Sequence, residues 1–192
     1  MPTQLAGVSV TIDGQPAYVY YVSPTQINVL TPDYLAETVP VEVDTPNGRS
    51  NAVTVPRNSF SPALFLSSQG GGKYAAAVHT DGACVAPAGL IPGATCRPAS
   101  PGEIILLFGT GFGATEPASP SAELVSQPAE LIAPSAIQIG GTVATTLFAG
   151  LVTPGLYQFN VTVPPVADGD QPVVIEIGGL RSQENTYIPV GR

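Results

Sequence analysis

The chain has 192 residues and a formal net charge of −8, with 14 acidic and only 6 basic residues. So few basic residues cannot form a stripe that tracks phosphates, which excludes nucleic acid and anionic membrane surfaces as expected partners. Hydrophobic residues make up 44% of the chain, enough to fill a core, and 21 glycines and 21 prolines interrupt the apolar segments. No apolar run approaches the ~20 residues that span a bilayer, so no membrane insertion is expected.

The first 56 residues predict short strands separated by turns. Residues 7–12, GVSVTI, alternate apolar and polar side chains, and Asp13-Gly14 is a hairpin signal. Asn47-Gly48 is a second two-residue turn. The other predicted strands of this half cover residues 16–22, 25–30, 39–44 and 51–55.

The later half repeats this pattern. Residues 26–28 (QIN) and 158–160 (QFN) lie 132 residues apart, and Arg49-Ser50 and Arg181-Ser182 share that offset. Between the copies, further strands are predicted within residues 61–68, 73–82 and 103–111. One offset at separate places indicates two copies of one unit.

The predicted fold is therefore all-β, with two immunoglobulin-like β-sandwich units. Residues 1–56 form the first repeat, which is apparently incomplete, and residues 57–192 form the second, complete one with a Cys84–Cys96 loop. The first unit must bury its apolar face through upstream sequence, docking on the second unit or another chain; we favour upstream sequence and docking. An open sheet edge within residues 7–55 would also permit self-association.

Several segments resemble those of a known family: VSPTQINV, SPALF, PASPGEIILLFGTGFGATEP, AGLVTPGLYQFNVTVP and IGGLRSQENTYIPV. The chain is similar to the uncharacterised C-terminal domain of large secreted proteins from Solibacter and other acidobacteria, and its GTGFG element is similar to the turn of IPT/TIG-type immunoglobulin-like domains. The resemblance implies β-sandwich modules in a secreted or cell-surface setting, and it transfers no catalytic residues.

Cys84 and Cys96 are the only cysteines, and they flank a loop of Pro, Gly and small residues. A disulfide between them would stabilise the fold by roughly 3 kcal/mol and would imply an exported protein. Two free thiols are the alternative. A zinc site lacks ligands, because His79 is the only histidine.

Catalytic residues are difficult to find in this sequence. His79 lies near Asp81, and Ser100 is a serine that folding could bring to it, which makes a small hydrolase the enzyme hypothesis. The non-catalytic alternative is a histidine at a strand end followed by an Asp-Gly turn. The glycines at 109, 111 and 113 resemble a phosphate loop, but the prolines that follow disfavour the helix such a loop requires.

Two binding features remain. Asp168 and Asp170 flank a glycine and are the candidates for calcium, which prefers more oxygens than two carboxylates supply. Tyr18 and Tyr20 alternate onto one side of a strand, with Tyr21 on the other, and Tyr18 and Tyr20 are the candidates for stacking on sugar rings.

The leading hypothesis is a secreted, non-catalytic module for adhesion, anchoring or protein interaction at the end of a larger exported protein. A hydrolase centred on His79 and a carbohydrate-binding module are the alternatives. The expected partner is a protein or a surface glycan, and no cofactor is predicted.

Overall fold

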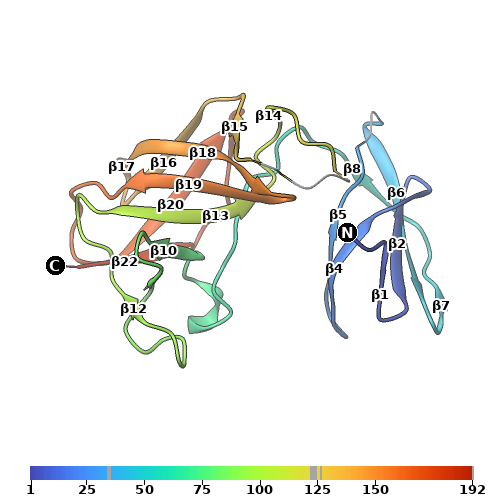
Figure 1. The fold of residues 1–192 in the computed structure, drawn as a ribbon, viewed down its shortest axis with the longest axis horizontal. Coiled ribbons are helices and arrows are strands. Elements are labelled where there is room, and N and C mark those ends of the chain that lie inside the picture. Colours follow the sequence, from blue (N-terminus) through green and yellow to red (C-terminus); the bar gives the residue numbers. More distant parts are fainter. Residues whose placement is uncertain (34–35, 122–124, 126, 192) are drawn as a thin grey trace. The chain divides into compact units, whose positions relative to one another are not determined.

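A computed structural model of the chain describes residues 1–33, 36–121, 125 and 127–191. The prediction of an all-β, immunoglobulin-like fold is confirmed, with 51% of the structure in strands and 2% in helical turns. The chain divides into two compact units (Figure 1): unit 1 comprises Met1–Asn58 with Ser119–Leu124, and unit 2 comprises Ser59–Ala118 with Val125–Arg192. No described helix is long and apolar enough to cross a membrane.

Unit 1 consists of two small sheets. The larger has the order β1-β2-β6-β7, with β3 paired to β2 and β8 to β6, and the smaller is the antiparallel pair β4-β5. Two-residue turns reverse the chain at Asp13-Gly14, between β2 and β3, and at Pro46-Asn47, between β6 and β7. The second turn lies one residue before the predicted Asn47-Gly48, because Gly48 already pairs with Thr45 as the first residue of β7. The strands are β1 (Gln4–Leu5), β2 (Val8–Ile12), β3 (Gln15–Pro16), β4 (Tyr18–Val22), β5 (Ile27–Leu30), β6 (Thr38–Thr45), β7 (Gly48–Arg49) and β8 (Val53–Pro56).

Unit 1 covers part of its own apolar face. The alternation along β2 points its apolar side chains to one side, where they meet Ala17 and the apolar side chains of β5 and β6. The core consists of buried Val10, Ile12, Ala17 and Val39, with half-buried Ile27, Val29, Val41 and Val43 packed against them. The pair β4-β5 thus covers part of the apolar face of the larger sheet. The sequence predicted these two strands but not that they form a separate sheet.

Unit 2 has more strands. One sheet has the order β12-β11-β10-β13-β19-β18-β15-β14 with β9 on β13, and another has the order β17-β16-β20-β21 with β22 on β20. The strands are β9 (Ala63–Leu64), β10 (Ala77–His79), β11 (Cys84–Val85), β12 (Cys96–Arg97), β13 (Ile104–Thr110), β14 (Thr115–Glu116), β15 (Ala129–Leu131), β16 (Ser135–Ile139), β17 (Thr142–Val143), β18 (Thr145–Thr153), β19 (Leu156–Thr162), β20 (Gly169–Ile177), β21 (Leu180–Arg181) and β22 (Tyr187–Val190).

The core of unit 2 lies between these sheets. Strand β13 alternates buried and half-buried residues, which places Ile105 and Leu107 inside beside Phe159 and Val161 of β19. The opposite face of the core comes from β16 and β20, where Ile137, Ile175 and other aliphatic side chains are fully buried. This is the two-layer arrangement of a β-sandwich.

Both units use the same strand register. Val10 of β2 lies opposite Val43 of β6, and Ile137 of β16 lies opposite Ile175 of β20. The pair β4-β5 corresponds in the same way to β18-β19. Each of these pairs has an irregularity at the matching place, between Val19 and Tyr21 in unit 1 and between Thr146 and Phe148 in unit 2.

Side-chain hydrogen bonds repeat as well. In both copies a glutamine amide donates to an asparagine two residues on: Gln26 to Asn28 over 2.6 Å, and Gln158 to Asn160 over 2.7 Å. In both copies a serine hydroxyl accepts a backbone N–H over 3.0 Å. The pairs are Val43 with Ser50 and Ile175 with Ser182.

The glycine-rich segment after β13 admits a close backbone approach. Gly111 has φ 79°, and a Cβ there would lie 2.0 Å from the carbonyl oxygen of Ser61. Gly113 has φ 89° and faces the ring of Phe60 in the same way. Only glycine fits these two positions, so the segment turns the chain beside residues 59–61.

Disulfide formation is confirmed. Cys84 and Cys96 are bonded, and their Cα atoms are 4.4 Å apart. They lie directly opposite each other in the parallel pair β11-β12, so the loop between them is tied at the edge of the sheet.

Candidate functional site

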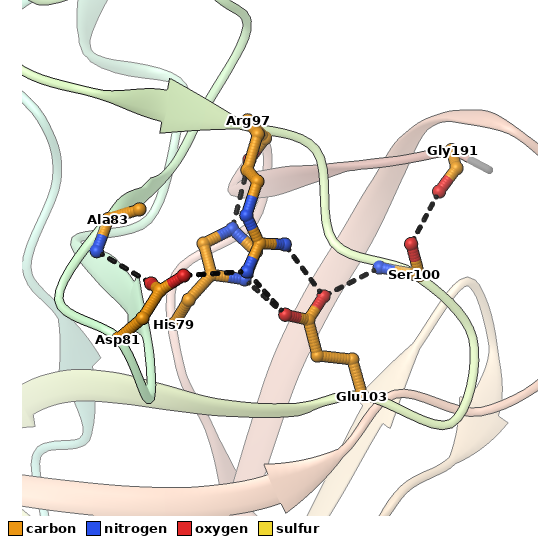
Figure 2. A network of polar contacts seen from close by, with 7 residues as sticks. All are labelled: His79, Asp81, Ala83, Arg97, Ser100, Glu103 and Gly191. Atoms are coloured by element: carbon orange, nitrogen blue, oxygen red, sulfur yellow. Dashed lines mark hydrogen bonds and ion pairs between the residues drawn. The ribbon is translucent and has the colours of Figure 1, made fainter.

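The densest polar cluster surrounds His79 at the end of β10 (Figure 2). The ring is 1% exposed. Its Nδ1 lies 2.7 Å from Oε1 of Glu103, and its Nε2 lies 3.1 Å from the backbone carbonyl oxygen of Arg97. A carbonyl oxygen only accepts, so Nε2 carries a proton in this contact. Neither ring nitrogen has a free lone pair facing solvent.

Glu103 holds the cluster together. Its carboxylate accepts from the guanidinium of Arg97, from His79 and, over 3.0 Å, from the backbone N–H of Ser100. Burial alone would raise the pKa of Glu103, but the bonds from Arg97, the Ser100 N–H and His79 outweigh burial and hold that pKa below its usual range. The carboxylate is therefore charged at neutral pH.

Arg97 connects this buried part of the cluster to the surface. Its guanidinium lies 2.8 Å from Oε1 of Glu103 and 3.2 Å from Oδ2 of Asp81. Two hydrogen bonds to the Asp81 carboxylate hold its pKa below the usual range. The bond from the backbone N–H of Ala83 has the larger effect, and the bond from the guanidinium of Arg97 has the smaller one. The arrangement closes the turn after β10 onto β12.

The cluster brings together all three catalytic candidates, but it pairs them with other partners. Asp81 contacts Arg97, and the hydroxyl of Ser100 donates to the carbonyl oxygen of Gly191 over 3.0 Å. A hydrolytic triad would need His79 between Asp81 and the serine hydroxyl. As arranged, these side chains join the turn after β10, the segment between β12 and β13 and the residue after β22.

The two aspartates of the predicted calcium loop, Asp168 and Asp170, have different surroundings in the structure. Asp170 lies at the start of β20, where its Oδ2 accepts from Nζ of Lys73 over 2.6 Å and from the hydroxyl of Tyr74 over 3.2 Å. Asp168 is exposed and lies before the strand. Among the described residues, no group of three or more His, Cys, Asp and Glu side chains could hold a metal ion.

The tyrosines of β4 lie on unit 1. Tyr18 is half-buried, whereas Tyr20 and Tyr21 are 48% and 49% exposed. Strict alternation had placed Tyr21 on the opposite side from Tyr20. The irregularity in the pairing of β4 with β5 between Val19 and Tyr21 breaks that alternation, so both neighbouring rings reach the surface.

Strand β5 presents a backbone edge. Among the described residues it pairs only with β4. Its counterpart β19 lies between β18 and β13 and is paired on both sides. An unpaired edge exposes backbone donors and acceptors that can bind an added strand.

Two features of the site escaped sequence reasoning. Arg97 lies 18 residues and Glu103 lies 24 residues from His79, and no local pattern links them. The side-chain amide of Gln183 also pairs with the backbone of Leu64 across 119 residues. Such long-range partners become visible only when the sheets are assembled.

Comparison with known proteins finds a family model that matches the N-terminal part of the chain. Residues 3–61 match the family model described as "IPT/TIG domain". The match covers unit 1 and supports the immunoglobulin-like interpretation, and the GTGFG element lies outside it. No curated protein matches the chain.

One solved structure is similar in outline. It is "SGBP-B from a complex xyloglucan utilization locus in Bacteroides uniformis", with 12% identity and a TM-score of 0.36. The similarity covers 83% of this chain and 31% of that one, so the chain spans about a third of that structure's length. At this TM-score the likeness carries no argument about fold or function.

Proposed function

We propose that the chain is a non-catalytic binding module of a larger exported protein and serves adhesion, anchoring or protein interaction. The observation that carries the proposal is the β4-β5 ribbon of unit 1, residues 18–22 and 27–30. This ribbon combines a strand edge that no described residue pairs with and two exposed tyrosine rings. Strand edges and exposed aromatic side chains are both features that recognise partners.

The disulfide supports an exported setting. Disulfides persist in oxidising compartments, and Cys84 and Cys96 are joined. The resemblance to the acidobacterial C-terminal domain points to the same setting and stays a prediction. Secretion or display at the cell surface is therefore part of the proposal.

Glycan binding is the second candidate function. Tyr20 and Tyr21 are adjacent and about half exposed, so their rings are available for stacking against sugars. A tyrosine hydroxyl is protonated at neutral pH, and burial raises the pKa of Tyr20 further above its ordinary value. Tyr18 is half-buried and offers less of its ring.

The hydrolase hypothesis receives no geometric support. A general base needs a nitrogen that can take a proton from a nucleophile within hydrogen-bond reach. His79 is buried, with both nitrogens engaged, and the Ser100 hydroxyl donates elsewhere.

Binding assays on the immobilised full chain separate these functions. We expect a displayed library of extended peptides to yield ligands that, when titrated into the full chain in solution, shift amide resonances of unit 1. Retention of glycans that is lost in Tyr20→Ala and Tyr21→Ala variants would favour the second candidate. Hydrolysis of a model ester or glycoside, abolished by His79→Ala, would overturn the non-catalytic proposal.

A further inference from the structure

Strand β5 is the point where the two units differ most in their pairing. In unit 2 the corresponding strand β19 carries β13 on its outer edge. We propose that the edge of β5 binds an extended segment of a partner polypeptide, antiparallel to β5, with two aliphatic side chains spaced two residues apart. This inference rests on the proposed function and specifies the partner's chemistry.

Unit 2 supplies the register. Ile105 of β13 lies opposite Val161, and Leu107 lies opposite Phe159. Because β4-β5 and β18-β19 share their register, Val29 corresponds to Val161 and Ile27 corresponds to Phe159. The partner segment therefore places its aliphatic side chains opposite Val29 and Ile27.

The backbone direction follows from hydrogen bonds at the end of β19. The N–H of Val163 donates to the carbonyl oxygen of Glu103 over 2.8 Å, so this residue faces β13. Backbone groups alternate in direction along an antiparallel strand, so Val161 and Phe159 also face β13. In β5, the N–H groups of Val29 and Ile27 consequently point to the edge that has no partner strand in the described part of the chain.

Strand β13 confirms the same alternation from its own side. The N–H of Phe108 donates to Ala76 on the opposite side from β19. The neighbouring Leu107 therefore directs its N–H toward β19, as does Ile105. Leu106, between them, directs its N–H away.

Burial shows what the edge of unit 1 lacks. Phe159 and Val161 are 0% exposed, and so is Ile175 across the core. Their counterparts Ile27, Val29 and Val43 are only half-buried. Two aliphatic side chains added beside β5 would cover apolar surface that β13 and its neighbours cover in unit 2, and this removal of apolar surface from water favours binding.

The outward positions tolerate polar side chains. Asn28 is exposed and hydrogen-bonded to Gln26, and its counterpart Asn160 lies opposite Leu106. A partner segment therefore needs aliphatic residues only on its inward face. The recognised class is an alternating strand with an apolar pair inside, and its outward residues are free to vary.

A synthetic peptide tests the proposal directly. The probe carries the sequence of residues 103–110 with two appended lysines for solubility, and it is titrated into the full chain. Two N-methylated versions serve as a matched pair. One is methylated at the positions of Ile105 and Leu107, whose N–H groups should bond to β5, and the other at the position of Leu106.

We expect the plain peptide to bind and to shift the amide resonances of Ile27 and Val29. Loss of two backbone hydrogen bonds should weaken binding by about tenfold or more for the doubly methylated peptide. The peptide methylated at the position of Leu106 should bind like the plain one. Equal binding by both methylated peptides would overturn the proposed edge and register.

Other outcomes separate this inference from the proposed function. Absence of peptide binding, while library ligands bind at Tyr20 and Tyr21, would overturn the inference and leave the binding module intact. Self-association of the chain through β5 that the peptide fails to displace would make a second copy the occupant and would also overturn the inference. Amide shifts confined to β19 would show that the peptide replaces β13 in unit 2, and this result would contradict binding at β5.

A register-specific cross-link provides a second measurement. Asn28→Cys places a thiol at an exposed position that corresponds to Asn160, opposite Leu106. Directly opposite residues that do not share backbone hydrogen bonds lie about 4.5 Å apart at Cα, within the range of a disulfide. A peptide with cysteine at the position of Leu106 should cross-link, and one with cysteine at Leu107 should not; the reverse result would contradict the register.

Discussion

Units 1 and 2 share a strand register and differ in how completely that register is buried. Val29 and Val161 occupy equivalent places, yet one is half-buried and the other is 0% exposed. The difference comes from β10 and β13, which lie outside the repeated part and have no counterpart among the described residues of unit 1. The comparison shows that local pairing is set by the repeated sequence, whereas core burial depends on the strands added around it.

The largest expected effect compares the two cores. Phe159→Ala removes a fully buried ring and should cost unit 2 about 3–5 kcal/mol of unfolding free energy. Ile27→Ala at the equivalent place should cost unit 1 about 1–2 kcal/mol, because part of that side chain already contacts water. Urea unfolding followed by the amide resonances of each unit measures both losses. Equal losses would show that the half-buried position is packed as tightly as the buried one.

The disulfide should stabilise only the unit that contains it. Replacing Cys84 and Cys96 together by alanine should cost unit 2 about 3 kcal/mol, because the unfolded chain regains the freedom of the closed loop. The urea transition of unit 1 should not move. Reduction of the unmodified chain is the control and should reproduce the loss. A matching shift in unit 1 would mean that the two units unfold together.

The acid response should be confined to unit 2 in the same way. The pKa of Glu103 is lowered in the folded chain, so its contribution is present above the unfolded value of about 4.3 and is lost as pH falls through the lower folded value. Glu103→Gln should cost about 1–3 kcal/mol at neutral pH, because the charged partner of Arg97 and His79 is removed. Unfolding free energies at several pH values should then vary less in the variant. An unchanged pH profile would exclude Glu103 as the titrating group.

The sequence predicted those features that arise from neighbouring residues. Alternation in residues 7–12 predicted strand β2, and Asn47-Gly48 predicted a turn that the structure forms one residue earlier, at Pro46-Asn47. The paired triplets at 26–28 and 158–160 predicted a duplication, and both make the same hydrogen bond. The all-β class and the disulfide are likewise confirmed.

Features that depend on contacts between distant strands could not be predicted from the sequence. His79 could be singled out as the only histidine, but its partners Arg97 and Glu103 come from β12 and the residue before β13. Tyr21 was placed on the wrong side of β4, because a pairing irregularity interrupts the alternation that the prediction assumed. In both cases the decisive contact is made across strands and leaves no periodic signal in the chain.

The smallest expected effect uses the most closely matched pair in the molecule. Ser182 and Ser50 each accept a backbone N–H over 3.0 Å, from Ile175 and Val43 respectively. Ser182 is 3% exposed, so Ser182→Ala leaves a buried N–H without a partner and should cost about 1–3 kcal/mol. Ser50 is exposed, so water can replace its hydroxyl, and Ser50→Ala should cost about 0.5 kcal/mol. Hydrogen exchange at Ile175 and Val43 measures the two losses at the bonds themselves. Equal acceleration of exchange at Ile175 and Val43 would show that unit 1 shields the Val43 N–H from water as well as unit 2 shields the Ile175 N–H. The difference in burial between the two units would then have no energetic consequence at this hydrogen bond.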